Sequence, residues 1–257
     1  MFFVFNKQKI YAYLVSVVTV ILLFCIASSI NTTGNTIQTS SNINQKLLPI
    51  YNVQTEEKKV AFTMNCAWNA DDIDSILETL NNNNTKITFF MVGDWIEKYP
   101  EAVKKIYESG NEIASHSDTH PHVNNLSYDE NIEEIEKSND KIEKATGSRT
   151  KIYRAPYGEY NDTVIKAAQD KEYFCIQWNL DTLDYTGLTG SEMWNRLDSK
   201  LKSGDIILSH NGTKHTADSL DMLIKNIKSK GFEVVKVSEL IYKENYTINN
   251  NGTQMKK

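Results

Sequence analysis

At residues 112–122 the sequence reads Glu-Ile-Ala-Ser-His-Ser-Asp-Thr-His-Pro-His, a short β-type run followed by three histidines. Similar β-type runs recur along the chain, and amphipathic helical stretches separate them. The predicted strands are residues 60–63, 87–92, 112–115, 152–155, 173–179, 205–209 and 233–235. Seven strands that alternate with helices predict an α/β fold, either a parallel sheet or a (β/α) barrel.

The helices between these strands have recognisable ends. Ser127 is followed three residues later by Glu130, which is the pattern of a capping box at a helix N-terminus. Gly147 is expected to end the same helix, because glycine adopts the left-handed conformation that closes many helices. Gly110 and Gly231 predict two further helix ends.

The overall charge argues against one class of function. The 257 residues include 28 basic and 33 acidic side chains, which gives a net charge of −5. A nucleic-acid-binding protein would normally carry a basic stripe, so we expect no nucleic-acid partner. Three cysteines are too few for a disulfide framework. The sequence indicates no protein partner.

The N-terminal region predicts export. Residues 10–30 are uncharged, and Lys7 and Lys9 precede them. This pattern predicts a single transmembrane anchor with residues 1–9 in the cytoplasm and the rest of the chain outside the cell membrane. A cleaved signal segment, which would give a secreted protein, is the alternative. We expect a flexible stalk at residues 31–57, one domain at residues 58–243 and a polar, frayed tail at residues 244–257.

All five histidines lie near the ends of predicted strands, where α/β folds build their sites. His116 and His120 are four residues apart and could bind one metal ion, although such a pair also occurs on ordinary surfaces. His210 follows the strand at 205–209 and suits a general acid, with Asp181 or Asp184 as its carboxylate partner. A purely structural role for His210 stays open.

Two further strand ends complete the candidate site. Arg154 lies in the predicted strand 152–155, where it could orient a carboxylate or an oxyanion or form a surface ion pair. The loop after the first strand contains Cys66, Asp71 and Asp72. These side chains are candidates for a third metal ligand.

Taken together and in this order, the motifs resemble those of the polysaccharide deacetylases, the NodB homology domain of carbohydrate esterase family 4. The similar region spans about residues 58–242, and the motifs are His-Ser-x-x-His at 116–120, Arg-x-Pro-Tyr at 154–157, Trp-x-x-Asp-x-x-Asp at 178–184 and Leu-x-His at 208–210. The loop at 66–72 resembles the membrane-anchored, PdaB-like sporulation branch. The resemblance implies an irregular (β/α) barrel with its site at the strand ends.

The resemblance also implies roles for individual residues. His116 and His120 would hold a divalent metal, usually zinc, which activates water and the acetamide carbonyl. Asp72 is the first choice for the third ligand and Cys66 the second. His210 would protonate the leaving amine, and Asp184 would orient it.

The same resemblance implies a substrate pocket. Trp178 and Leu208 would line a small apolar pocket for the acetyl methyl group. The backbone amide of Tyr157 would stabilise the oxyanion of the tetrahedral intermediate.

Two positions depart from the usual family motif, and at one of them Cys66 replaces the second aspartate. Asn65 stands where the family has the aspartate that acts as general base, and an amide cannot accept a proton near neutral pH. Asp71 or Asp72 is a candidate for a displaced base. Arg154 would lack its usual partner, because in the family it pairs with the aspartate that is absent here.

The sequence therefore predicts a metal-dependent enzyme that removes N-acetyl groups from cell-wall polysaccharide, such as peptidoglycan or a related N-acetylglucosamine glycan. Asn65 predicts that this activity is impaired. The alternative is a catalytically inactive glycan-binding or scaffolding protein on the same fold. A third hypothesis is a metal-storage or redox protein that uses Cys66.

Overall fold

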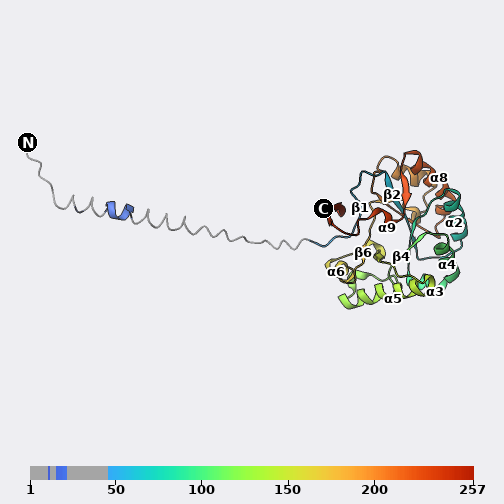
Figure 1. The fold of residues 1–257 in the computed structure, drawn as a ribbon, viewed down its shortest axis with the longest axis horizontal. Coiled ribbons are helices and arrows are strands. Elements are labelled where there is room, and N and C mark those ends of the chain that lie inside the picture. Colours follow the sequence, from blue (N-terminus) through green and yellow to red (C-terminus); the bar gives the residue numbers. More distant parts are fainter. Residues whose placement is uncertain (1–10, 12–15, 22–45) are drawn as a thin grey trace, which may run out of the picture. The chain divides into compact units, whose positions relative to one another are not determined.

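The computed structural model describes Tyr11, residues 16–21 and residues 46–257. Residues Lys46–Lys257 form one compact unit (Figure 1). The predicted anchor at residues 10–30 lies mostly outside the described residues. In the parts of the chain that the structure describes, no helix has the length and apolar character needed to cross a membrane.

A parallel sheet forms the centre of the unit. Its strands are β2 (Lys59–Cys66), β3 (Thr88–Met91), β4 (Glu112–Ser115), β5 (Ile152–Tyr153), β6 (Phe174–Cys175), β7 (Leu180–Asp181), β8 (Ile206–His210) and β9 (Glu233–Val235). The order is β6-β5-β4-β3-β2-β8-β7, and β9 also pairs with β2. The edge strands β6 and β7 do not pair with each other, so the irregular barrel is incomplete. The parallel α/β architecture predicted from the sequence is confirmed.

The segment before residue 58 belongs to the folded unit. The amide of Ile50 donates to the carbonyl of Cys175 at 2.8 Å, and the amide of Val53 donates to the carbonyl of Gly204 at 2.9 Å. Ile50 and Val53 are buried, and β1 is Asn52–Val53. This segment bridges β6 and the start of β8. The prediction of a stalk through residue 57 is therefore wrong for residues 46–57, whose apolar side chains complete the core.

The C-terminal residues also form regular structure. Strands β10 (Tyr246–Ile248) and β11 (Thr253–Lys256) pair antiparallel, and β11 pairs in parallel with β1. The side chain of Gln254 is fully buried and exchanges two hydrogen bonds with the backbone of Tyr242, at 2.8 and 2.7 Å. The polar tail at 244–257 is thus held in a small second sheet, contrary to the prediction that it frays.

The helices on the outer face of the parallel sheet are α2 (Ile73–Asn82), α3 (Gly93–Lys98), α4 (Pro100–Glu108), α5 (Tyr128–Thr146), α6 (Asp162–Asp170), α7 (Gly190–Leu197) and α8 (Thr216–Ser229) (Figure 1). Helix α9 (Val237–Leu240) instead packs with Ala61 and Phe90 on the inner face. The 3-10 turns are η1 (Val123–Asn125), η2 (Pro156–Gly158) and η3 (Asp184–Thr186). The capping box at Ser127 and the left-handed cap at Gly147 are both confirmed.

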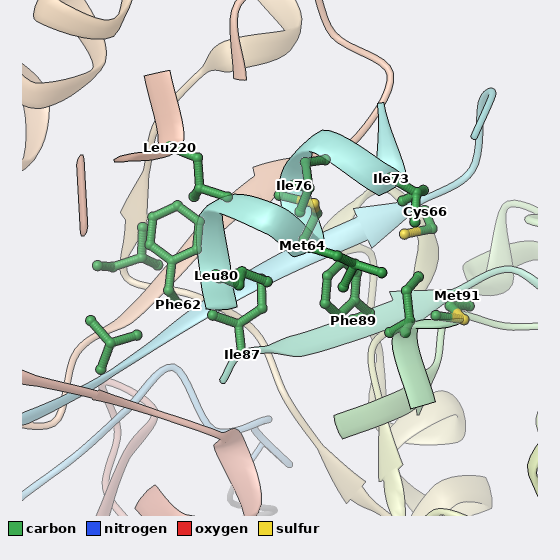
Figure 2. Packing of buried hydrophobic residues seen from close by; sticks show 14 of the residues in the cluster. Phe62, Met64, Cys66, Ile73, Ile76, Leu80, Ile87, Phe89, Met91 and Leu220 are labelled. Carbon is green, nitrogen blue, oxygen red and sulfur yellow. The ribbon is translucent and has the colours of Figure 1, made fainter. Parts of the chain in front are cut away.

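Strand β2 separates the two faces of the sheet. Phe62, Met64 and Cys66 project toward α2 and pack in the outer core (Figure 2). Side chains of a strand alternate between faces, so Thr63 and Asn65 point to the interior of the half-barrel. This alternation decides which residues of the first motif reach the site.

Two predicted strands are much shorter than expected, and β5 covers only residues 152–153 of the predicted strand 152–155. Within the predicted strand 173–179, only residues 174–175 pair as a strand, and β7 follows as a separate strand that the sequence did not predict. The side chain of Asn179 donates to Asp205 at 2.7 Å and accepts from the amide of Ile206 at 2.9 Å. Together with the bond from the amide of Asn179 to the carbonyl of Ile206 at 3.2 Å, these hydrogen bonds attach the residue before β7 to the start of β8.

Candidate active site

A pocket of about 570 Å³ lies at the carboxyl ends of the parallel strands. Its walls include the predicted residues Asn65, His116, His120, Tyr157, Trp178, Leu208 and His210, together with Ala67, Trp68, Val92, Asp94, Trp95, Thr119, Gly158, Asp181 and Tyr185. Residues more than 140 positions apart in the sequence thus share one cavity, because parallel strands end at the same edge of a sheet.

Arg154 lies beneath the pocket and is fully buried. Its Nη1 donates to Oδ1 of Asn65 and to Oγ1 of Thr63, both at 2.9 Å, and its guanidinium lies 3.8 Å from the centre of the Phe90 ring. Its side-chain hydrogen bonds in the structure go to neutral oxygens, including the carbonyls of Ile176 and Gln177. Burial lowers the pKa of Arg154 to about 9.

The contact between Arg154 and Asn65 answers the question that the sequence raised about this arginine. Its partner position is occupied by an amide oxygen that accepts the hydrogen bond without supplying a negative charge. The pocket floor therefore holds a buried cation where a carboxylate would complete an ion pair.

The two histidines of the first motif converge on the pocket. His116 Nδ1 lies 2.8 Å from the carbonyl oxygen of Arg154, and the centres of the His116 and His120 rings are 5.0 Å apart. Because a carbonyl only accepts, Nδ1 of His116 carries the proton and Nε2 is the unprotonated nitrogen. Burial, and next the proximity of His120, hold the pKa of His116 well below its usual value. Burial also lowers the pKa of His120.

The loop that carries these histidines is held by a residue that the sequence did not single out. Glu134 of α5 accepts from Oγ of Ser117 at 2.7 Å, from the amides of Asp118 and Thr119 at 2.9 and 3.0 Å, and from Oγ1 of Thr119 at 2.8 Å. Ser117 and His120 have positive φ angles of 68° and 59°. Such conformations persist only where surrounding contacts hold them, and Glu134 provides four.

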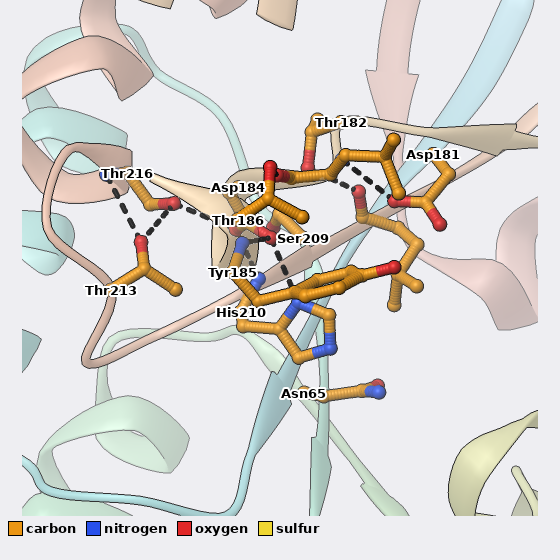
Figure 3. A network of polar contacts seen from close by, with 12 residues as sticks. Asn65, Asp181, Thr182, Asp184, Tyr185, Thr186, Ser209, His210, Thr213 and Thr216 are labelled. Atoms are coloured by element: carbon orange, nitrogen blue, oxygen red, sulfur yellow. Dashed lines mark hydrogen bonds and ion pairs between the residues drawn. The ribbon is translucent and has the colours of Figure 1, made fainter. Parts of the chain in front are cut away.

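His210 and Asp184 form the second part of the site (Figure 3). Asp184 is buried, and its Oδ1 lies 2.8 Å from Nδ1 of His210. The carboxylate also accepts from the amides of His210 and Tyr185 at 2.6 and 3.0 Å and from Oγ1 of Thr216 at 2.7 Å. Asp184, rather than Asp181, is therefore the partner of His210. Nε2 of His210 makes no bond to this carboxylate and is the ring nitrogen available to a substrate.

Asp181 lines the pocket beside this pair, but its carboxylate accepts a hydrogen bond from the backbone. Its Oδ1 accepts from the amide of Leu183 at 2.8 Å. Burial raises the pKa of this carboxyl.

Figure 3 shows Asn65 on the side of His210 that faces away from Asp184. The strand register agrees, because Asn65 of β2 lies opposite His210 of β8.

The predicted third metal ligand is not brought to the histidines. Asp72 does not line the pocket; its Oδ2 accepts from the amide of Gly212 at 2.7 Å and its Oδ1 from Nδ2 of Asn211 at 3.2 Å. Cys66 faces the outer core beside Ile73, where burial raises the pKa of its thiol (Figure 2). Asp71 is exposed and outside the pocket, so neither aspartate of this loop is placed as a displaced base.

The residues present therefore do not complete a metal site. Across residues 46–257 and the few described before them, no group of three His, Cys, Asp or Glu side chains could share an ion. His116 and His120 supply two nitrogen donors, whereas a catalytic zinc site normally has three protein ligands.

Tyr157, Trp178 and Leu208 line the pocket, and three aromatic residues that were not predicted as site residues, Trp68, Trp95 and Tyr185, join them. Tyr157 has a φ angle of 57°, and a Cβ on the next residue, Gly158, would lie 2.9 Å from the ring of Trp178. Tyr185 directly follows Asp184, and that neighbour was the only sequence signal for it. Trp95 lies after β3, whose end carries no motif.

Comparisons with known proteins agree with this geometry. A family model described as polysaccharide deacetylase matches residues 52–176. The peptidoglycan-N-acetylglucosamine deacetylase of Bacillus cereus is 30% identical over 186 residues, which cover 71% of this chain and 68% of that protein. The uncharacterized protein YlxY of Bacillus subtilis is 35% identical over 193 residues; the match covers 75% of this chain but only 60% of YlxY.

A solved structure is similar over the same region. BA3943 of Bacillus anthracis, described as a CE4 family pseudoenzyme, is 34% identical with a TM-score of 0.72, and the match covers 75% of this chain and 68% of that one. A mutant of BA3943 is described as having restored enzymatic activity. The strand order, the pocket at the strand ends and these relatives lead to one conclusion. This chain belongs to the polysaccharide deacetylase family.

Proposed function

We propose that this protein recognises N-acetylated cell-wall glycan in the pocket and that its capacity for hydrolysis is impaired. The observation that carries the proposal is the contact between Asn65 and Arg154 on the pocket floor. The groups suited to an N-acetyl substrate are present around it, whereas the position expected to hold a general base is an amide. Peptidoglycan is the proposed glycan, because relatives in this family are named as peptidoglycan deacetylases.

The pocket suits an acetamido group for three reasons. Trp178 and Leu208 give an apolar wall for the methyl group. The backbone amide of Tyr157 is the proposed donor to the carbonyl oxygen. His210, held by Asp184, can direct a proton toward the nitrogen of the acetamide.

A second candidate function is slow deacetylation, and the intact His210–Asp184 pair favours it. A missing general base typically costs a factor of about 10² to 10⁴ in rate, which leaves room for residual turnover. Zinc would supply a polarised carbonyl and an activated water if it bound. Since the described residues offer two imidazoles and no third ligand, no step of the proposed chemistry runs through a metal.

Binding and turnover should be measured on the same preparation. Titration calorimetry with the tetramer of N-acetylglucosamine measures binding, and acetate release with and without added zinc or cobalt measures turnover. The matched control is a variant with both His116→Ala and His120→Ala. Binding with acetate release no higher than in this control supports recognition alone, and release above the control supports slow deacetylation. No binding and no release would refute both candidates.

The location of the protein follows from its substrate. We propose that residues 46–257 lie outside the cytoplasmic membrane, attached by the segment at residues 10–30 or released after cleavage. Lys7 and Lys9 before the uncharged run support this orientation. Membership of the PdaB-like sporulation branch is proposed on the loop at residues 66–72. Protease accessibility of the domain in intact cells with their wall removed tests the location, and protection from protease would contradict it.

A further inference from the structure

His122 lies close to the candidate site, yet it does not line the pocket. Its ring stacks on the ring of Tyr157, with ring centres 4.3 Å apart and planes 14° apart. Its Nδ1 lies 2.7 Å from Oε1 of Glu159, which follows Tyr157 by two residues. His122 therefore joins the loop after β4 to the loop after β5 by two contacts with different chemistry.

The loop after β5 contains a backbone conformation that needs support. Tyr157 has φ and ψ angles of 57° and 8°, in the left-handed region that residues other than glycine seldom adopt. Such a conformation persists only where surrounding contacts hold it. The side chain of Tyr157 is 58% exposed, and its ring contacts are with the imidazoles of His120 and His122. Much of the support for this conformation thus comes from the loop after β4.

The backbone amide of Tyr157 is the group that this conformation presents. In the part of the chain that the structure describes, no hydrogen bond uses this amide. It is the amide proposed above as the donor to the carbonyl oxygen of the acetamide. A hydrogen bond weakens steeply when the donor is misaligned, so a loop that is free to leave this conformation would be a poorer donor.

We propose that His122 is a positioning residue, which holds the amide of Tyr157 in the direction of the acetamide carbonyl by stacking on the Tyr157 ring. This inference rests on the proposed function. Glu159 contributes by accepting from Nδ1 of His122, because a ring held at one edge keeps its face on Tyr157. The two contacts fix the donor before the ligand arrives, and a preorganised donor loses little conformational entropy on binding.

The test observes the amide of Tyr157 by NMR in the full chain with isotope-labelled tyrosine. Saturation of the wild type with the N-acetylglucosamine tetramer should shift this amide proton downfield, because the amide then donates to a carbonyl. In His122→Ala the shift at saturation should fall to less than half, and titration calorimetry should show about three- to tenfold weaker binding. His122→Phe keeps a flat ring on Tyr157 and should recover most of the shift and the affinity.

The matched control is His215→Ala, which removes a histidine that does not line the pocket and has no contact with Tyr157. This variant should match the wild type in both measurements. A merely structural role for His122 would lower the stability of the protein without changing the amide shift of the saturated complex. The shift therefore separates positioning of the donor from general support of the fold.

Two results would overturn the role of His122 while glycan recognition stands. One is an unchanged amide shift in saturated His122→Ala, and the other is a wild type that binds the tetramer with no downfield shift at Tyr157. A wild type that binds no tetramer would refute the proposed function, and the role of His122 with it. Thermal unfolding checks that His122→Ala is folded. Glu159→Ala removes the partner of the imidazole and carries the test if His122→Ala does not fold.

Discussion

Replacing Asn65 by aspartate would create a buried ion pair with a partner that is already in place. Nη1 of Arg154 lies 2.9 Å from Oδ1 of Asn65, and Asn65 is only 5% exposed. The two side chains have the same shape, so Asn65→Asp changes charge with little change in packing. Arg154 is desolvated in the wild-type protein, so only the new carboxylate loses water.

The size of the effect on stability follows from the distance between the two charges and their burial. Two charges about 4 Å apart attract by about 4 kcal/mol at an effective dielectric constant of 20, and burying the carboxylate costs several kcal/mol. An adjacent arginine lowers the pKa of an aspartate, which corresponds to about 1.4–4 kcal/mol of stability that depends on pH. A carboxylate with a lowered pKa contributes this stability above its ordinary pKa and loses it as the pH falls through the lowered value.

The assay is urea unfolding of the wild type and Asn65→Asp between roughly pH 3 and pH 7. The difference in unfolding free energy should move in favour of the variant as the pH rises, by about 1.4–4 kcal/mol in total. A difference that is flat, or that moves against the variant, would refute the claim that Arg154 is a cation without a charged partner. Acetate release should rise by about 10² to 10⁴ if the base alone limits turnover.

Three further variants test the rest of the site. Glu134→Ala should destabilise the protein by about 1–3 kcal/mol and speed hydrogen exchange at the amide of Thr119, whereas Glu133→Ala on the exposed face of α5 should do neither. Asp184→Asn should lower the free energy of unfolding in urea by about 1–3 kcal/mol, because an amide cannot accept from all four donors that contact the Asp184 carboxylate. An unchanged free energy of unfolding would show that these hydrogen bonds do not stabilise the fold. Cys66→Ala should leave the affinity for zinc unchanged, since the thiol lies in the outer core. A weakened affinity for zinc would instead show that Cys66 is a metal ligand.

Local patterns predicted much of the fold. The capping box at Ser127 and the cap at Gly147 depend on residues within one helical turn, and both are present. Strand β1 escaped prediction because its partner β11 lies about 200 residues away, at Asn52 opposite Thr253. Strands β10 and β11 pair with each other locally, but their polar composition is typical of a linker. The burial of Gln254 could not be read from its neighbours, because the partner that satisfies it is the backbone of Tyr242.

The sequence by itself determined the alternation of strands and helices, and with it the edge where the histidines, Arg154 and Asp184 meet. Only the tertiary structure decided which side chains of the first motif enter the site. Strand alternation turns Asn65 inward and Cys66 outward, and the contact with Gly212 holds Asp72 away from the histidines. The physical reason is that motif spacing records order along the chain, whereas a site depends on strand register, the direction of each side chain and contacts between distant segments.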